Sequence, residues 1–329
     1  MINNVGIIGL GSIGCRHLRL LRELRPELKI IAVRLGKGKK VAEEKLANAV
    51  VHSLEEAIVY GIEAAVIATP AVFHIKQAIA LMRQGVHVLI EKPISHSLEN
   101  INELLRVEKE SKRVGLVGYC LRYNTGALKF NDMLKNKKIG QILHVRVDCG
   151  SYLPDWRKGQ DYRESVSAKA ELGGGVLLEL SHELDYIRWF FGEMKNVSAN
   201  IQNSGTLGID VEDSVDMIFE SEQGFPVSVH LDFNSRNICR KCIARCSKGD
   251  LIWNVVANKV LWQPADGLEE VEMYENDRNY VYKEQLKHFF DFIENKKRPL
   301  VSIDNGVAVL RMIESAKKSH QTGKRIVLT

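Results

Sequence analysis

Two short segments carry side chains of the kinds that stabilise charge and move protons in enzymes. In the first, Lys92 lies between Glu91 and Pro93, directly after the apolar run 87–90. A residue that precedes proline avoids the helical region, so Lys92 is expected in an extended conformation at a strand end. Its ammonium group would then point into the crevice beyond that strand. An ordinary surface lysine is the alternative interpretation.

The second segment is 173–185, in which three glycines precede an apolar stretch that contains a histidine among carboxylates. We expect a continuous helix over 176–191, which places Glu179, His182 and Asp185 at positions i, i+3 and i+6. The first two share one face, and Asp185 lies one turn beyond His182. An imidazole flanked by carboxylates suits general acid–base chemistry near neutral pH. A histidine that is hydrogen-bonded within the core is the alternative.

The first expected strand-to-helix junction fits the pattern G-x-G-x-x-G. Gly9 permits the tight turn, Gly11 lets a pyrophosphate approach the backbone, and Gly14 lets helix and strand pack closely. Ser12 and Ile13 lie in the turn just before the helix expected over 14–23, whose unpaired N–H groups attract phosphate. The pattern predicts a dinucleotide-binding site, and a glycine-rich turn with only a structural role is the alternative.

The residue at the end of the second strand bears on the choice of dinucleotide. An acid is expected there to hold the ribose 2′-hydroxyl of NAD. The chain has Arg34 instead, followed by Lys37, Lys39 and Lys40. A guanidinium can grip a 2′-phosphate that a carboxylate would repel, so we predict NADP(H) rather than NAD(H). The alternative is a solvated basic start of the next helix.

Over residues 1–121, short strands alternate with helices. Strands are expected at 5–10, 30–34, 64–68, 87–90 and 114–119. Helices are expected at 14–23, 40–46, 54–59, 72–84 and 99–111. This alternation predicts a doubly wound parallel sheet, the Rossmann fold, which binds ligands outside the carboxyl ends of its strands. Thr69, Pro70 and His74 follow the third of these strands and are expected to line that edge with Glu91 and Lys92.

In residues 122–329 the strict alternation of strands and helices ends, and several expected strands follow one another. This pattern predicts a second, α+β domain. Its strands are expected at 142–150, 197–201, 212–220, 225–233, 239–247, 251–256 and 259–261. Its helices are expected near 125–134, 176–191, 283–295 and 305–322. Short strands at regular spacing predict a large, mostly antiparallel open sheet with a helix packed on one face. An open sheet of this kind is a candidate contact surface for a homodimer or homotetramer.

The loop 151–167 lies between the strand expected at 142–150 and the helix expected at 176–191. It combines aromatic and cationic side chains. Trp156 and Tyr162 offer stacking faces to a sugar ring or base. Arg157, Lys158 and Arg163 offer charge to a phosphate or carboxylate. A solvated loop without a binding role is the alternative. The expected substrate-binding residues are Arg122, Tyr123 and Asn124 after the fifth strand, Trp156, Arg157 and Tyr162 in the loop, and His182.

Four segments together resemble the Gfo/Idh/MocA family of oxidoreductases. They are 9–14, 68–74, 85–93 and 173–185. The resemblance covers nearly the whole chain, and Glu-Lys-Pro after the fourth strand is its most specific motif. It implies a two-domain enzyme that uses a nicotinamide cofactor on sugars, cyclitols or sugar nucleotides. It also implies that the last segment packs back on the first domain.

The resemblance further implies roles for single residues. The family's lysine maps onto Lys92, and its His-x-x-Asp pair maps onto His182 and Asp185. Many members carry an aspartate four residues before the histidine, where this chain has Leu178, and the nearest acid is Glu179. In the implied reaction, His182 takes the proton of a secondary alcohol while a hydride goes to the nicotinamide. Lys92 stabilises the negative charge that develops on the same oxygen.

Composition excludes several other classes of protein. The 46 basic and 41 acidic residues give a formal charge of +5, which does not indicate a nucleic-acid partner. Six cysteines are too sparse for a disulfide scaffold, and no apolar run reaches the roughly 20 residues that span a bilayer. A cytoplasmic protein is therefore expected. Cys239 and Cys242 do not predict a metal site, because on a strand they face opposite sides.

Two other functions are compatible with the same sequence. One is a dinucleotide sensor without catalysis, which would need neither Lys92 nor His182. The other is an epimerase or glycosidase of the same fold that uses the cofactor without net redox change. Retained nicotinamide with no net change in its absorbance would distinguish this second function from a dehydrogenase.

Overall fold

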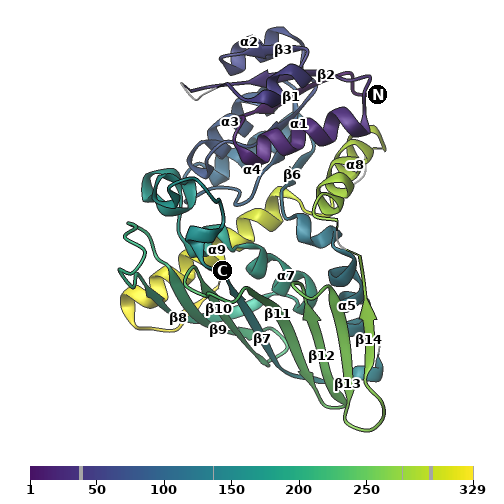
Figure 1. The fold of residues 1–329 in the computed structure, drawn as a ribbon, viewed down its shortest axis with the longest axis vertical. Helices are drawn as coiled ribbons and strands as arrows, with labels where there is room; N and C mark the ends of the chain where they lie inside the picture. Colours follow the sequence, from purple (N-terminus) through teal and green to yellow (C-terminus); the bar gives the residue numbers. More distant parts are fainter. Residues whose placement is uncertain (37–39, 136, 276, 296–298, 329) are drawn as a thin grey trace. The chain divides into compact units, whose positions relative to one another are not determined.

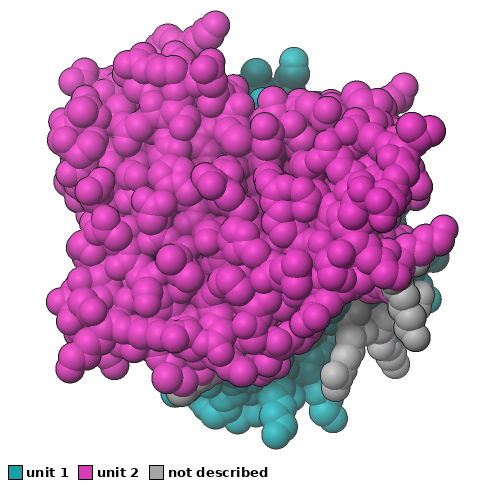
Figure 2. Space-filling view, turned by 90° about the horizontal axis from the view of Figure 1, so that it is seen from below, with its two compact units in different colours: residues 1–120, 278–310 teal, residues 121–277, 311–329 magenta. Residues whose placement is uncertain are grey.

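A computed structural model describes residues 1–36, 40–135, 137–275, 277–295 and 299–328. The chain forms two compact units, drawn in different colours in Figure 2. The first unit contains residues 1–120 and 278–310, and the second contains residues 121–277 and 311–329. The last long helix, α9 (Ile303–Thr322), contributes its first residues to the first unit and the remainder to the second.

The first unit is built on a six-stranded sheet in which every pairing is parallel (Figure 1). Its strands are β1 (Asn4–Ile8), β2 (Lys29–Val33), β3 (Ala49–Val51), β4 (Ala64–Ile67), β5 (His87–Ile90) and β6 (Gly115–Val117). Their order is β3-β2-β1-β4-β5-β6, so the winding direction changes between β1 and β4. The predicted doubly wound sheet is confirmed, and β3 is a strand that the sequence did not predict.

Helices cover both faces of this sheet. They are α1 (Ser12–Leu24), α2 (Leu54–Val59), α3 (Ala71–Arg83), α4 (Ile101–Ser111) and α8 (Tyr280–Asn295). Helix α1 contacts α8, whereas α3 contacts α2 and α4. Right-handed crossovers produce this division, because they leave β1 in one direction and β4 in the other. The helix predicted over 40–46 is wrong in type, since Ala42–Leu46 forms a 3-10 helix with no buried residue.

Helix α4 carries a carboxyl group whose titration should be visible in the stability of the first unit. Burial, together with the nearby Asp304 carboxylate, raises the pKa of Glu108 to about 7 from an ordinary value of 4.5. Its Oε1 lies so close to Gly115 that a methyl group built there would come within 2.9 Å. The folded protein therefore holds a proton that the unfolded chain releases between these two pH values.

We expect the stability of the wild-type protein to fall as pH rises from about 4.5 to 7 and to stay lower above that window. Ionised Glu108 lowers the free energy of unfolding by roughly 3 kcal/mol. Glu108→Gln removes the titrating group, so its melting temperature should exceed that of wild type at pH 8 and match it near pH 4.5. Thermal unfolding of both proteins across this range measures the difference. Parallel pH profiles for the two proteins would contradict the assignment.

The second unit is built on a nine-stranded sheet. Its strands are β7 (Ile142–Gly150), β8 (Met194–Gln202), β9 (Ser214–Ser221), β10 (Pro226–Asp232), β11 (Cys239–Cys246), β12 (Gly249–Asn254), β13 (Lys259–Pro264), β14 (Glu270–Met273) and β15 (Ile326–Val327). Their order is β14-β13-β12-β11-β7-β10-β9-β8-β15. Within the described residues β7 and β10 pair in parallel, and the other pairings are antiparallel. The predicted large, mostly antiparallel sheet is confirmed.

One face of this sheet packs against helices α5 (Thr125–Lys135), α6 (Val176–Glu179) and α7 (His182–Phe191) (Figure 1). In β11, buried side chains on the face that packs against the helices alternate with more exposed ones on the other face. The buried residues are Cys242, Ala244 and Cys246. Aromatic rings fill the space below the helices. They are Phe130, Tyr186, Phe190, Phe191 and Trp253.

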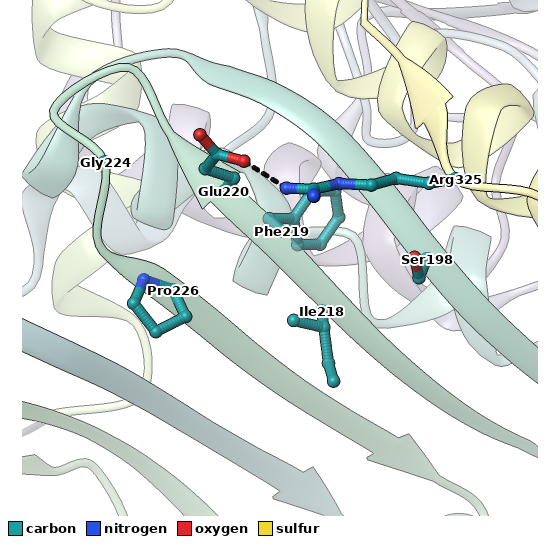
Figure 3. Close-up of a pocket in the computed structure, with 7 residues that line it drawn as sticks. All are labelled: Ser198, Ile218, Phe219, Glu220, Gly224, Pro226 and Arg325. Atoms are coloured by element: carbon teal, nitrogen blue, oxygen red, sulfur yellow. Dashed lines mark hydrogen bonds and ion pairs between the residues drawn. The ribbon is translucent and has the colours of Figure 1, made fainter.

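The opposite face of the sheet is open in this chain. It carries ion pairs and scattered apolar side chains, among them the exposed Ile218. Near the β8–β9 edge, this face is hollowed by a cavity of about 310 Å³, which Figure 3 shows in close-up. The ion pair between Glu220 and Arg325 lies across the hollow. None of the side chains predicted for the functional site lines it.

Candidate active site

The glycine-rich turn between β1 and α1 requires glycine at its first and last positions. Gly9 has a positive φ of 92°, and a side chain there would meet Thr69 and Ala68 at about 3 Å. A methyl group on Gly14 would lie 1.9 Å from the Gly9 carbonyl oxygen. The turn can therefore close, and α1 can approach β1, only with these two glycines.

The middle glycine has open space above it instead of a neighbour. A methyl group on Gly11 would meet nothing within 4 Å. Gly11 is also the N-cap of α1, where no side chain accepts a hydrogen bond from the first N–H groups. The first N–H groups of α1, which begins with Ser12 and Ile13, therefore face an open space without a side-chain acceptor. This arrangement fits the pyrophosphate of a dinucleotide.

Arg34 stands at the carboxyl end of β2, as predicted for a contact with the cofactor ribose. Its backbone N–H donates to the carbonyl of Val51, and its Nη1 lies 3.6 Å from Glu44 Oε1. A ligand that binds the Arg34 guanidinium would therefore share it with the Glu44 carboxylate. Lys37 and Lys39 lie outside the described residues, and Lys40 is exposed.

The residues predicted after β4 form hydrogen bonds within the protein. The Thr69 hydroxyl donates to Gln77 Oε1 at 2.7 Å. His74 is buried, and its ring nitrogens lie 2.7 Å from the Thr69 carbonyl oxygen and 2.9 Å from that of Pro93. Burial lowers the pKa of His74, and the two carbonyl oxygens that face its ring nitrogens oppose this effect. His74 thus joins the turn at Pro70 to the segment that follows Lys92.

Glu91 and Lys92 occupy the carboxyl end of β5, with different surroundings. Glu91 is buried, and its Oε1 lies 2.6 Å from Nε2 of His17 on α1. Its other oxygen accepts the backbone N–H of Lys92 at 3.2 Å. Lys92 itself is half-buried and precedes a cis peptide bond to Pro93. Glu91, predicted as a cofactor contact, therefore links the glycine-rich helix to the backbone of Lys92.

The helix predicted over 176–191 is interrupted in the second unit. Helix α6 ends at Glu179, Leu180 and Ser181 form a turn, and α7 begins at His182. The expected alignment therefore does not extend to Glu179, whereas His182 and Asp185 stay three residues apart within α7. Glu179 is half-buried, and its Oε1 accepts the hydroxyl hydrogen of Ser167 at 3.0 Å. His182 is half-buried and starts its helix, so its side chain is presented by a helix end.

Two buried acids in the first turn of α7 hold its N-terminus in place. Asp185 accepts two hydrogen bonds from Arg122, from Nε at 2.9 Å and from Nη2 at 2.7 Å. Burial raises the pKa of Asp185, and the Arg122 guanidinium opposes this effect. Glu183 pairs in the same two-point manner with Arg240 of β11, at 2.6 and 3.0 Å. His182 therefore directly precedes two anchored carboxylates in the first turn of α7, and Asp185 supports the helix by binding Arg122.

The three substrate-binding candidates after β6 are buried. They are Arg122, Tyr123 and Asn124, with exposed fractions of 6%, 3% and 2%. Asn124 Oδ1 accepts the backbone N–H of Ala127 and so caps α5. Arg122 binds Asp185 and lies 5.7 Å from the centre of the Trp189 ring.

The aromatic loop is a series of short 3-10 turns. The indole N–H of Trp156 donates to the Ser151 hydroxyl at 2.9 Å, and its ring meets Phe233 edge to face. The Tyr162 hydroxyl donates to the Leu207 carbonyl at 2.8 Å. Both rings thus anchor the loop through their polar atoms, whereas Arg157 is exposed.

Four charged residues of these surroundings were not predicted from the sequence. They are His17, Glu183, Arg236 and Arg240. A signal existed for Arg240, because it shares the buried face of its strand with Cys242, and a cation on an apolar face requires a partner. His17 follows Gly14 on the inner face of α1, where a buried polar side chain also needs one.

Two negative findings concern the part of the chain that the structure describes. No cluster of three or more histidine, cysteine, aspartate or glutamate side chains there is arranged to hold a metal ion. No helix there is long and apolar enough to cross a bilayer.

The doubly wound sheet with its open glycine-rich turn, joined to a unit with a large open sheet, defines a two-unit dinucleotide-binding protein. The family model "Oxidoreductase family, NAD-binding Rossmann fold" matches residues 3–119, and "GFO/IDH/MocA C-terminal domain" matches residues 127–252. The chain belongs to the Gfo/Idh/MocA family of oxidoreductases, as its motifs predicted.

Characterised relatives are distant in sequence. A 1,5-anhydro-D-fructose reductase of Ensifer adhaerens is 25% identical over 333 residues, which cover 98% of each chain. An inositol 2-dehydrogenase of Salmonella typhimurium is 22% identical over 241 residues, 71% of this chain and 68% of that protein.

Solved structures show the same fold over almost the whole chain. Levoglucosan dehydrogenase in complex with NADH aligns with a TM-score of 0.88 at 19% identity, covering 99% of both chains. The WlbA dehydrogenase from Bordetella pertussis, in complex with NADH and UDP-GlcNAcA, aligns with a TM-score of 0.86 at 21% identity. That alignment covers 100% of this chain and 99% of that one.

Proposed function

We propose that this protein transfers a hydride between a nicotinamide cofactor and a secondary alcohol or ketone of a sugar, cyclitol or sugar nucleotide. One observation carries the proposal. Lys92 stands at the carboxyl end of β5, on the sheet edge where Gly11 leaves open space for a pyrophosphate. The names of the relatives, which include a sugar reductase and an inositol dehydrogenase, support this class of substrate.

The chain's own residues would handle the proton and the charge. In the oxidation, the C–H bond of the carbinol breaks with its electron pair, and the nicotinamide accepts that hydride when it is bound. His182 takes the hydroxyl proton, and the C–O bond becomes a carbonyl. Lys92 stabilises the negative charge on the oxygen while the proton leaves. Glu91 positions Lys92 through its backbone N–H, and Asp185 positions α7 through Arg122.

A screen for changes in the absorbance of reduced nicotinamide tests the proposal. Sugars, uronates, cyclitols and nucleotide-activated sugars are offered with both cofactors and in both directions. Turnover with a member of these classes is the expected result. Binding of the cofactor without turnover of any compound would favour the dinucleotide sensor. A converted substrate with no net absorbance change would favour the epimerase or glycosidase.

Arg34 gives a separate prediction about the cofactor, for which NADP(H) remains our proposal. Arg34→Asp should weaken NADP(H) binding by about ten- to one-hundredfold, because a charge-assisted hydrogen bond is worth about 1.5–3 kcal/mol. Binding of NAD(H) should change little. Titration of cofactor fluorescence measures both, with Arg19→Gln on the exposed face of α1 as the control. A clear preference of the wild-type protein for NAD⁺ would contradict the proposal.

The open face of the nine-stranded sheet is the surface we propose for a homodimer or homotetramer. Its exposed apolar side chains, such as Ile218, support this role. A cytoplasmic location stays a prediction from the sequence.

A further inference from the structure

A cation on the second unit is held in place without a carboxylate partner. The guanidinium carbon of Arg236 lies 3.5 Å from the centre of the Tyr152 ring, a close cation–π contact. Arg236 is exposed, and among the described residues no carboxylate lies within ion-pair distance of it. The edges of its guanidinium, which carry the N–H donors, remain available to a ligand.

Backbone hydrogen bonds join the segment around Tyr152 to the end of β10 and the residue that follows it. The N–H groups of Ser151 and Leu153 donate to the carbonyls of Asp232 and Phe233 at 3.3 and 2.9 Å. The Asp232 carboxylate in turn accepts hydrogen bonds from Asn234 and Ser235 at 2.5 to 2.7 Å. The segment that carries Tyr152 and the turn that carries Arg236 are therefore built as one piece, so ordering Arg236 costs little when a ligand binds.

The contact lies at the end of the sheet where His182 stands. Gly150, the last residue of β7, pairs with Asp232 of β10 and with Cys239, the first residue of β11. Arg240, the next residue of β11, binds Glu183, which is adjacent to His182. Tyr152 and Arg236 thus belong to the strand ends that support the start of α7.

Two other cations of the same region, Arg163 and Lys169, differ from Arg236 in having carboxylate partners. Arg163 also lies over a tyrosine, 5.6 Å from the centre of the Tyr162 ring, but its Nε donates to Asp161 at 2.9 Å. Lys169 is paired with Glu164 at 2.5 Å. Their charges are neutralised within the loop, whereas that of Arg236 is not.

We propose that Arg236, held over Tyr152, binds an oxyanion of the substrate, either a phosphate ester or a carboxylate. The inference rests on the proposed function and narrows its substrate class to anionic sugar derivatives. A planar guanidinium matches both oxyanions by paired N–H donors. A neutral polyol offers no charge to a cation that the protein leaves without a carboxylate.

Calorimetry on the intact chain saturated with NADPH, the cofactor proposed above, tests this proposal. The probes are uridine diphosphate for phosphate, glucuronate for carboxylate, and glucose as the neutral reference. We expect the wild-type protein to bind at least one anion more tightly than glucose, and to lose affinity as salt increases. Arg236→Gln should weaken the binding of that anion by about tenfold or more. Arg146→Gln, at an exposed arginine of β7 that pairs with Asp148, is the matched control and should leave the affinity unchanged.

The pattern of binding identifies the anion and can overturn the proposal. Binding of uridine diphosphate alone indicates phosphate recognition, and binding of glucuronate alone indicates carboxylate recognition. Unchanged affinity in Arg236→Gln, or no anion bound more tightly than glucose, would refute the role of Arg236. Because calorimetry requires no turnover, failure of the oxidoreductase proposal appears separately, as the absence of turnover with either nicotinamide cofactor for every compound screened.

Discussion

Replacing Lys92 by methionine or His182 by asparagine is expected to lower kcat by about two to four powers of ten. Methionine keeps the length of Lys92 but removes the charge that would stabilise the substrate oxygen. Asparagine keeps a polar side chain at the start of α7 but removes the proton acceptor. Because the glycine-rich turn is untouched, cofactor binding should persist in both variants.

Steady-state kinetics on the substrate found by the screen measures these losses. Cofactor titration separates them from unfolding. Lys76→Met on the exposed side of α3 and His144→Asn on the open sheet face are matched controls, and both should keep near-normal rates. If both groups act at one oxygen, the double variant should lose much less than the product of the single losses. Near-normal turnover in either single variant would refute its assigned role.

Breaking the buried pair between Arg122 and Asp185 is expected to destabilise the second unit by about 3–5 kcal/mol. Both side chains are almost fully buried, and two hydrogen bonds join them. Asp185→Asn removes the carboxylate charge that two hydrogen bonds join to the Arg122 guanidinium in this buried pair. Since the pair anchors α7, the same variant should also lower kcat through the displacement of His182.

Denaturant unfolding followed by tryptophan fluorescence measures this loss, because Trp189 and Trp253 lie in the second unit. The matched control is the exposed pair of Lys129 and Glu272 in the same unit, whose removal should cost less than about 0.5 kcal/mol. Replacing Arg122 and Asp185 together by leucine should recover much of the stability, since no unpaired charge remains. Equal losses for the buried and exposed pairs would contradict the expected effect of burial.

The first unit illustrates how far local sequence rules reach. The β-branched runs, the glycine-rich turn and the Glu-Lys-Pro segment each follow from short-range preferences, and the parallel sheet follows from their alternation. The strand β3 (Ala49–Val51) escaped prediction because three residues are too few for a periodic signal. Its place is determined by pairing with β2.

The second unit shows where such rules failed. Residues 176–191 are apolar enough to predict one helix, yet the chain turns at Leu180 and Ser181. Glu183 and Asp185 are then bound by Arg240 and Arg122, which lie 57 and 63 residues away. The exposed strand β14 (Glu270–Met273) also has no burial pattern to reveal it, and it forms because β13 offers an unpaired edge.

By itself, the sequence determined the doubly wound sheet, the large, mostly antiparallel sheet and the family. These depend on periodicity and on glycine and proline positions, which are properties of neighbouring residues. Only the tertiary structure decided which charged groups are partners and which are available. Glu91 and Asp185 are engaged by His17 and Arg122, while Arg236 is left over Tyr152. Pairing of charges depends on which distant residues the fold brings within a few ångströms, and no local pattern encodes it.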